Sequence, residues 1–117
     1  MKTAQERVIY NYCTGKPSAV VSDVLRSISA YTREDRVRFF KIGITNDPDR
    51  RFQEAYSRHY DKMFAVYQST SIDSVSRLED ELVEHNRDLA DNIVAGGGGS
   101  IGSPPYYLYV VVKYNHR

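Results

Sequence analysis

The chain has 117 residues and a formal net charge of +1, with 41% apolar and 26% charged residues. This length is sufficient for one hydrophobic core, so we expect one domain of a soluble globular class. We expect neither a signal peptide nor a membrane span, because the first twenty residues contain no continuous apolar run. The single cysteine, Cys13, excludes a disulfide framework and a Cys-based metal cluster. A cytoplasmic location is therefore the default expectation.

The charged residues are unevenly distributed along the chain. Residues 33–62 contain eight Lys or Arg and six Asp or Glu, whereas residues 71–93 contain two and seven. A basic segment beside an acidic one suits a site where carboxylates hold a metal next to a polyanion. A solvated acidic helix explains the same pattern, so charge alone leaves both interpretations open.

The N-terminal quarter of the sequence predicts two helices. Thr3 and Glu6 form a capping box, and apolar residues then recur near helical spacing, which predicts a helix over 3–12. A second helix is predicted over 18–25, after a Gly-Lys-Pro break. We expect residues 1–25 to be a helical extension of the domain that follows.

The next segment, residues 26–45, predicts a β-hairpin. Polar residues alternate with Ile28 and Ala30, a polar break follows, and strand-forming residues resume in VRFFKIGIT, residues 37–45. A three-residue loop would place Ile28 opposite Phe40. The alternation in the second strand puts Phe40, Ile42 and Ile44 on one face and Phe39, Lys41, Gly43 and the hairpin's Tyr31 on the other.

The remaining half of the chain predicts two helices and two strands. Asp47 as N-cap and Pro48 at the first helical position start a helix that ends near Tyr60. A strand over 63–70, an acidic helix from Ser71 or Asp73 to about 89–91, a loop over 95–105 and a strand over 105–113 follow.

These elements predict an α+β fold with a small, mainly antiparallel β-sheet, built from the β-hairpin and two further strands and flanked by helices. The loop contains GGGGS at 96–100, which matches a common engineered linker, so its native origin stays open.

Helical geometry separates the charged side chains that face the domain from those that face water. Arg51 falls at the boundary of the apolar stripe of its helix, whereas Arg50 falls on the far side. Glu79 lies closer to the apolar stripe of the acidic helix than the other acidic residues from this position onward. An inward-facing carboxylate needs a partner, so Glu79 predicts either a salt bridge or a functional site.

Several of these features together resemble the GIY-YIG nuclease superfamily. Ser29-Ala30-Tyr31 stands where that family has Gly-Ile-Tyr, and Lys41-Ile42-Gly43 stands where it has Tyr-Ile-Gly, as in a Lys-Ile-Gly branch of phage and bacterial proteins. Arg51 matches the family's catalytic arginine and Glu79 its metal-binding glutamate. The resemblance covers about residues 26–90, and we expect a GIY-YIG-like domain over 26–117.

The resemblance implies a metal-dependent endonuclease that hydrolyses DNA phosphodiester bonds. Glu79 would hold Mg²⁺ or Mn²⁺, Arg51 would bind the phosphate, and Tyr31 would help to remove a proton from the attacking water. Gly43 would be the close-packed turn that aims Arg51. We expect the nucleic acid to contact Lys41, Arg38, Arg58 and Tyr56.

Two departures from the family pattern keep other functions open. Ser29 replaces a glycine and Lys41 replaces a tyrosine, which suits a non-catalytic GIY-YIG-like module that binds nucleic acid or a small nucleotide. An unrelated α+β interaction domain with tyrosine-rich strands is the third interpretation. DNA is the expected partner, with RNA or a small nucleotide as alternatives, and a homodimer is left open.

Overall fold

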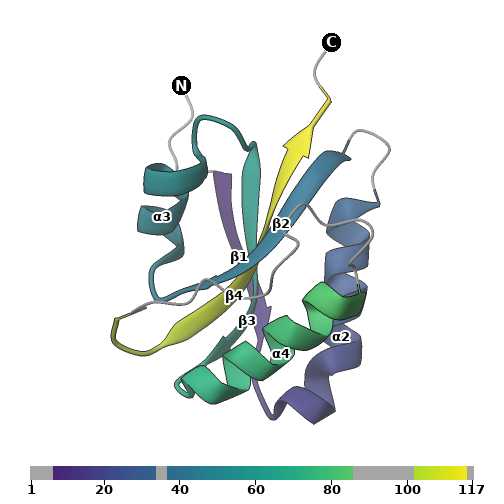
Figure 1. Cartoon of the computed structure of the whole chain (residues 1–117), viewed down its shortest axis with the longest axis vertical. Helices are drawn as coiled ribbons and strands as arrows, with labels where there is room; N and C mark the ends of the chain where they lie inside the picture. Colours follow the sequence, from purple (N-terminus) through teal and green to yellow (C-terminus); the bar gives the residue numbers. More distant parts are fainter. Residues whose placement is uncertain (1–6, 34–36, 86–101, 116–117) are drawn as a thin grey trace.

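The structure of the protein is a computed structural model that describes residues 7–33, 37–85 and 102–115. It is built around one four-stranded sheet with the order β1-β3-β4-β2 (Figure 1). None of the helices in these ranges combines the length and the apolar composition that a membrane crossing requires. The elements are, in chain order, β1 (Val8–Cys13), α2 (Pro17–Thr32), β2 (Val37–Thr45), α3 (Pro48–Arg51), the π-helix η1 (Phe52–Tyr56), β3 (Lys62–Ser69), α4 (Ile72–His85) and β4 (Tyr106–Tyr114).

The sheet is mixed, because β1 pairs with β3 in parallel while β4 pairs with both β3 and β2 in antiparallel orientation. The predicted α+β class is confirmed. The sheet differs from the prediction in one respect, because the pairing of β1 with β3 is parallel. The strands predicted over 63–70 and 105–113 correspond to β3 and β4. β4 is a central strand, which agrees with its nearly continuous run of buried apolar residues.

The predicted β-hairpin is wrong, because its first strand is part of helix α2. Val20, Val24 and Ile28 are buried at every fourth position, which is a helical period, and this pattern outweighs the short alternation around Ile28. The antiparallel partner of β2 is instead β4, with Ile42 paired to Val110. The expected boundary between residues 25 and 26 falls inside α2.

The predicted N-terminal helix is also wrong over the residues that the structure describes. Residues 8–13 form β1, where Val8 pairs with Met63 and Ile9 with Phe64 of β3. Pairing with a buried strand favours the extended backbone for this β-branched and aromatic segment. The predicted capping box of Thr3 and Glu6 lies outside the described residues.

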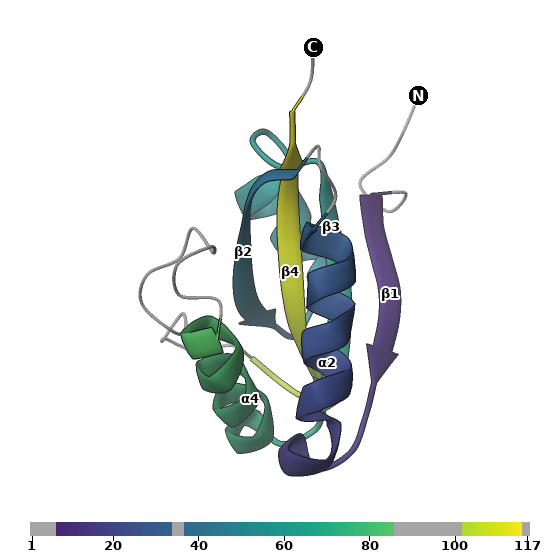
Figure 2. The same ribbon diagram turned by 90° about the vertical axis from the view of Figure 1, so that its right-hand side faces the viewer.

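Helices cover both faces of the sheet, and they divide the core into two parts (Figures 1 and 2). Helices α2 and α4 pack on one face, which we call the α2/α4 face, and η1 packs on the other, the η1 face. The α2/α4 face contains buried aliphatic residues from three strands and both helices, among them Val24, Ile28, Ile42, Val66, Leu78, Leu82, Leu108 and Val110. The η1 face contains a smaller cluster of Val8, Phe52, Tyr60, Met63, Tyr109 and Val111.

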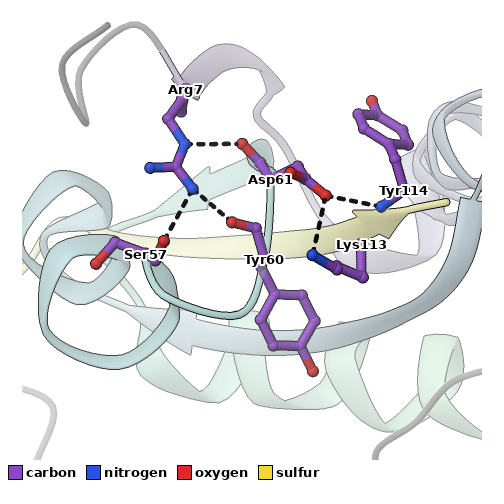
Figure 3. A network of polar contacts seen from close by, with 6 residues as sticks. All are labelled: Arg7, Ser57, Tyr60, Asp61, Lys113 and Tyr114. Atoms are coloured by element: carbon purple, nitrogen blue, oxygen red, sulfur yellow. Dashed lines mark hydrogen bonds and ion pairs between the residues drawn. The ribbon is translucent and has the colours of Figure 1, made fainter. Parts of the chain in front are cut away.

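Arg7 fixes the C-terminal end of η1 to the start of β1 (Figure 3). Its Nε donates a hydrogen bond to the Asp61 carbonyl at 3.0 Å, and its Nη2 donates to the carbonyls of Ser57 at 3.0 Å and Tyr60 at 2.6 Å. The guanidinium also lies 4.7 Å from the centre of the Phe52 ring. A cation that donates hydrogen bonds to the last carbonyl groups of a helix stabilises that helix end.

Asp61 extends this network to the end of β4 (Figure 3). Its Oδ2 accepts a hydrogen bond from the Tyr114 backbone N–H at 2.8 Å and lies 3.9 Å from Lys113 Nζ. Its own backbone N–H donates to the Val112 carbonyl at 2.9 Å. The end of η1 and the loop after it are therefore held by Arg7, the first described residue, and by Lys113 and Tyr114 at the end of β4.

Candidate functional site

The helix that carries Arg51 starts as the sequence predicts. The Asp47 side chain accepts a hydrogen bond from the Arg50 backbone N–H at 3.2 Å, and Pro48 occupies the first turn. The Thr45 hydroxyl in turn accepts a hydrogen bond from the Asp47 N–H at 3.0 Å. This double cap fixes the direction in which α3 leaves the end of β2.

A π-helix follows α3 and turns its aromatic side chains toward the sheet. The Ser57 N–H donates to the Phe52 carbonyl at 2.8 Å, a bond that spans five residues. Phe52 is buried and Tyr56 is half-buried, while Ala55 and His59, which an α-helical stripe would have included, are exposed. Single π-helical turns occur frequently at functional sites.

Gly43 lies in the middle of β2, directly opposite Tyr109 of β4. A Cβ atom built on Gly43 would lie 2.5 Å from Tyr109 Oη and 2.6 Å from Tyr109 Cζ. The Tyr109 ring therefore lies over the glycine, and only a residue without a side chain leaves room for it. Gly43 is a close-packed position, as expected, but within a strand rather than in a turn.

Tyr109, Tyr56 and Arg51 form a connected group on the η1 face, which we call the arginine–tyrosine cluster. The hydroxyl oxygens of Tyr56 and Tyr109 lie 2.7 Å apart, and Arg51 Nε donates to Tyr109 Oη at 3.5 Å. The two rings meet nearly edge to face at 5.7 Å, and the Arg51 guanidinium lies 5.7 Å from the Tyr56 ring centre. The three side chains come from η1, β4 and α3, so only the folded chain brings them together.

The cluster pairs a neutral phenol with a fixed cation. Tyr109 is 1% exposed, and burial raises its pKa, with a smaller contribution from Tyr56 in the same direction and an opposing one from Arg51. The hydrogen bond to Tyr109 raises the pKa of Arg51. Tyr109 therefore keeps its proton at neutral pH and acts as a hydrogen-bonding group, not as a base.

The outer part of the Arg51 guanidinium remains available to a ligand. Arg51 is exposed, and its contacts with Tyr109 and Tyr56 lie on the side of the guanidinium that faces the sheet. A guanidinium that is held at Nε still presents N–H donors in a planar fork, which matches the oxygens of a phosphate group.

The structure places two of the four predicted nucleic-acid contacts on the η1 face. Tyr56 belongs to the cluster, and Lys41 lies on the same face of β2 as Gly43, as the strand alternation predicts. Arg38 is exposed near the start of the same strand, with its guanidinium 5.9 Å from the Phe39 ring. The fourth predicted contact, Arg58, is an exposed residue just after η1.

Tyr31 is not brought together with Arg51. It lies in the last turn of α2, where its ring stacks on Phe64 at 3.9 Å and its hydroxyl accepts a hydrogen bond from Asn11 Nδ2 at 2.9 Å. It packs against the core of the α2/α4 face, on the opposite side of the sheet. The expectation that placed it beside Lys41 depended on the β-hairpin that does not form.

Glu79 faces the interior, as helical geometry predicts, but on the other side of the sheet from Arg51. It is 2% exposed on α4, on the side of the helix that buries Leu78 and Leu82 in the α2/α4 face. Glu79 also has an interaction partner within the protein, so it is not a free carboxylate.

This arrangement can be compared with what a divalent cation requires. Mg²⁺ usually keeps several water ligands and binds through one or two carboxylates together with substrate phosphate, which needs an open site. Glu79 is enclosed, and the described residues contain no group of three or more His, Cys, Asp or Glu side chains arranged to hold a metal. As it stands in this structure, Glu79 does not fit the role of a cation ligand next to Arg51.

Tyr109 is the residue that sequence reasoning missed. The strand that contains Tyr109 was predicted, but its tyrosines were considered as part of the tyrosine-rich strands of an interaction domain. The available signal was Gly43, because a glycine in the interior of a strand often marks a close approach by a neighbour. Only the strand order shows that this neighbour is β4.

One comparison with known proteins gives a match. The T5orf172 domain matches residues 11–97, a range that starts within β1, includes α4 and ends before β4 with its Tyr109. No match is found among curated proteins or among solved structures. The domain match covers well over half of the chain, and the chain belongs to the T5orf172 domain family.

Proposed function

We propose that the protein is a GIY-YIG-like nuclease domain that binds a phosphodiester of nucleic acid at the arginine–tyrosine cluster and hydrolyses it. The observation that carries this proposal is the exposed Arg51 guanidinium, which lies 3.5 Å from the buried Tyr109 hydroxyl and 5.7 Å from the Tyr56 ring centre. Membership of the T5orf172 domain family supports it, because this domain is related to the nuclease-like GIY-YIG fold.

Arg51 binds the scissile phosphate in this proposal. Its fork can donate two parallel hydrogen bonds to non-bridging oxygens, and its charge stabilises the negative charge that grows on them in the transition state. The contacts of the guanidinium with the Tyr109 hydroxyl and the Tyr56 ring favour one orientation before the substrate arrives. Such preorganisation lowers the cost of reaching the transition state.

In this proposal the hydrogen bonds run in one direction, from Arg51 through Tyr109 to Tyr56. Tyr109 accepts from Arg51, so its own proton is available for the bond to the Tyr56 oxygen. The Tyr56 hydroxyl is then free to donate outward to a phosphate or leaving-group oxygen. In this proposal the phenols donate and orient, in place of the proton-removing role that the family resemblance implied for Tyr31.

Metal dependence remains a prediction from the family resemblance. That resemblance implies Mg²⁺ or Mn²⁺ at Glu79, whereas the enclosed position of this side chain does not fit such a ligand. We therefore assign no step of the reaction to a metal ion.

The burial of Glu79 favours a second candidate function, a non-catalytic module of the same fold that binds nucleic acid. Such a module needs Arg51 for phosphate binding but no group that activates water. The two candidates differ in whether bound nucleic acid is cut.

A plasmid-nicking assay tests the proposal. Supercoiled DNA is incubated with the wild type, Arg51→Ala, Arg50→Ala and Glu79→Gln, each with Mg²⁺, Mn²⁺ or EDTA. We expect nicking by the wild type and by Arg50→Ala, and a loss of about 10²-fold or more in Arg51→Ala. Retained nicking in Arg51→Ala would overturn the assignment of the cluster, and DNA binding without nicking under any metal would favour the second candidate. Glu79→Gln separately tests the prediction that Glu79 holds the metal ion, because this role requires that the variant lose metal-dependent nicking.

A further inference from the structure

Three further tyrosines lie on the η1 face beside the arginine–tyrosine cluster. Tyr10 and Tyr12 come from the edge strand β1 and are 44% and 40% exposed, while Tyr107 comes from β4 and is half-buried. We call these residues, together with Gln68 of β3, the open tyrosine group. Tyr10 and Tyr12 are the two large exposed hydrophobic residues in the described part of the chain.

The rings of this group are held in place by their edges and hydroxyls. The Tyr107 ring lies 5.8 Å from that of Tyr10 and 5.5 Å from that of Tyr12, at interplanar angles of 81° and 76°. Gln68 Nε2 donates to the hydroxyls of Tyr107 at 3.3 Å and Tyr12 at 3.5 Å. A perpendicular contact covers at most one face of a ring, so Tyr10 and Tyr12 keep flat apolar surface in contact with water.

The open tyrosine group is continuous with the arginine–tyrosine cluster. In the sheet, Tyr109 pairs with Ala65, and Ala65 pairs with Tyr10, so the two tyrosines flank a small buried residue in one row. Adjacent strands are about 4.8 Å apart, which puts Tyr10 about two strand spacings from Tyr109. The Tyr10 hydroxyl donates to Asp49 Oδ2 at 2.8 Å, and Asp49 lies two residues before Arg51 on α3.

The chemistry of the two groups differs in a way that suits a nucleotide chain. Arg51 offers a cation for a phosphate, whereas the open tyrosine group offers ring faces and carries no basic side chain. The Asp49 carboxylate beside Tyr10 repels a phosphate from that position. The bases of a duplex are stacked within the helix, whereas unpaired bases have free faces that stack on aromatic side chains.

We infer that the open tyrosine group is a base-stacking subsite for unpaired nucleotides that flank the phosphate bound at Arg51, so that the preferred ligand is single-stranded nucleic acid. This inference rests on the proposed function and names its substrate class. If the open tyrosine group bound a protein partner instead, the chain would show no preference for single-stranded over double-stranded nucleic acid.

Fluorescence anisotropy with labelled oligonucleotides tests the subsite. A length of about 16 nucleotides is chosen, because this is the upper end of the site sizes of single-strand-binding OB-folds. The same sequence is offered single-stranded and as a duplex, in EDTA, to the wild type, Tyr12→Ala and Tyr12→Phe. The matched control is Tyr106→Ala, because Tyr106 packs on the α2/α4 side of the same strand. Thermal unfolding of each variant checks that it is folded.

We expect the wild type to bind the single strand more tightly than the duplex. Tyr12→Ala should weaken single-strand binding by about 5- to 100-fold, as loss of one stacked base does, and leave duplex binding unchanged. Tyr12→Phe and Tyr106→Ala should retain the wild-type preference. Equal affinity for both forms, an unchanged preference in Tyr12→Ala, or no binding of either oligonucleotide by the wild type would overturn the inference.

Failure of the inference and failure of the proposed function are distinguishable. If Arg51→Ala abolishes nicking while Tyr12→Ala leaves strand preference unchanged, the inference fails and the proposed function stands. If no protein nicks DNA but strand preference depends on Tyr12, the hydrolysis fails and the subsite stands as part of a binding module.

Discussion

The two faces of the sheet are built from different kinds of residue. The α2/α4 face is filled mainly by aliphatic side chains, and the charged residue Glu79 on this face is enclosed. The η1 face carries Tyr109, Tyr56 and Arg51 in one hydrogen-bonded group, with more exposed tyrosines alongside. The first face has the composition of a core, and the second combines burial with side chains that can bind a ligand.

The central strand β4 contributes side chains to both faces. Leu108 and Val110 point into the α2/α4 core, while Tyr109 between them points to the η1 face. A strand anchored by buried neighbours is a rigid support for a functional side chain. Substitutions on the two faces should therefore separate stability from binding.

The largest effect on stability is expected on the α2/α4 face. Leu82→Ala removes a fully buried side chain and leaves a cavity, which should lower the free energy of unfolding by about 2–5 kcal/mol. Urea denaturation measures this loss. Nucleic-acid affinity per folded molecule should stay at the wild-type value, and a selective loss of affinity would contradict the separation of the faces.

Gly43→Ala should have the next largest effect. Its Cβ would collide with the Tyr109 ring, so we expect about 1–3 kcal/mol of destabilisation together with weaker nucleic-acid binding. The matched control repeats the substitution in a Tyr109→Val background, where the ring is gone. If Gly43→Ala is as costly there, the ring is not the cause.

Tyr109→Phe removes only the hydroxyl that joins Arg51 to Tyr56. We expect about 0.5–1.5 kcal/mol of lost stability, because one buried hydrogen-bonding group disappears. The loss of orientation at Arg51 should lower nicking or binding by about tenfold, measured as initial rate or dissociation constant. Tyr31→Phe is the control on the other face, and equal losses in both variants would remove the special role of Tyr109.

A small effect is expected from alkaline pH. Burial raises the pKa of Tyr109, and burial with the bond to Asp49 raises that of Tyr10, above the value that each has in the unfolded chain. The stabilising contribution is therefore complete below about pH 10 and declines as pH rises toward the folded-state pKa. Urea denaturation from pH 8 to 11 measures the decline, which should be shallower in Tyr109→Phe. An equal decline in the variant would contradict the role of this phenol.

Local signals in the sequence were sufficient for the elements whose cause is local. Asp47 as N-cap and Pro48 in the first turn favour a helix start, and the β-branched run of β4 favours a strand. The prediction of a β-hairpin was wrong because the true partner of β2 is β4, which is distant in the chain, with Thr45 paired to Tyr107 and Val37 paired to Tyr114. Segment 26–31 alternates like a strand, but the burial of Val24 and Ile28 on α4 and the sheet decides for a helix.

The candidate site divides in the same way. Arg51 and the inward orientation of Glu79 follow from helical periodicity, which depends only on neighbours in the sequence. The contact of Arg51 with Tyr109 depends on strand order and on the π-helix η1, and neither leaves a periodic signal. Tyr31 was favoured by its place in a motif, and the helix that contains it turns it to the opposite face.

The central claim is that nucleic-acid phosphate binds at Arg51 on the η1 face, and two adjacent arginines test it most directly. Affinity for a single-stranded oligonucleotide is measured against salt concentration for the wild type, Arg51→Ala and Arg50→Ala, whose charge change is identical. We predict that Arg51→Ala lowers affinity at least tenfold and reduces the salt slope by about one, whereas Arg50→Ala stays within about threefold of the wild type. Equal losses in the two variants would contradict the claim.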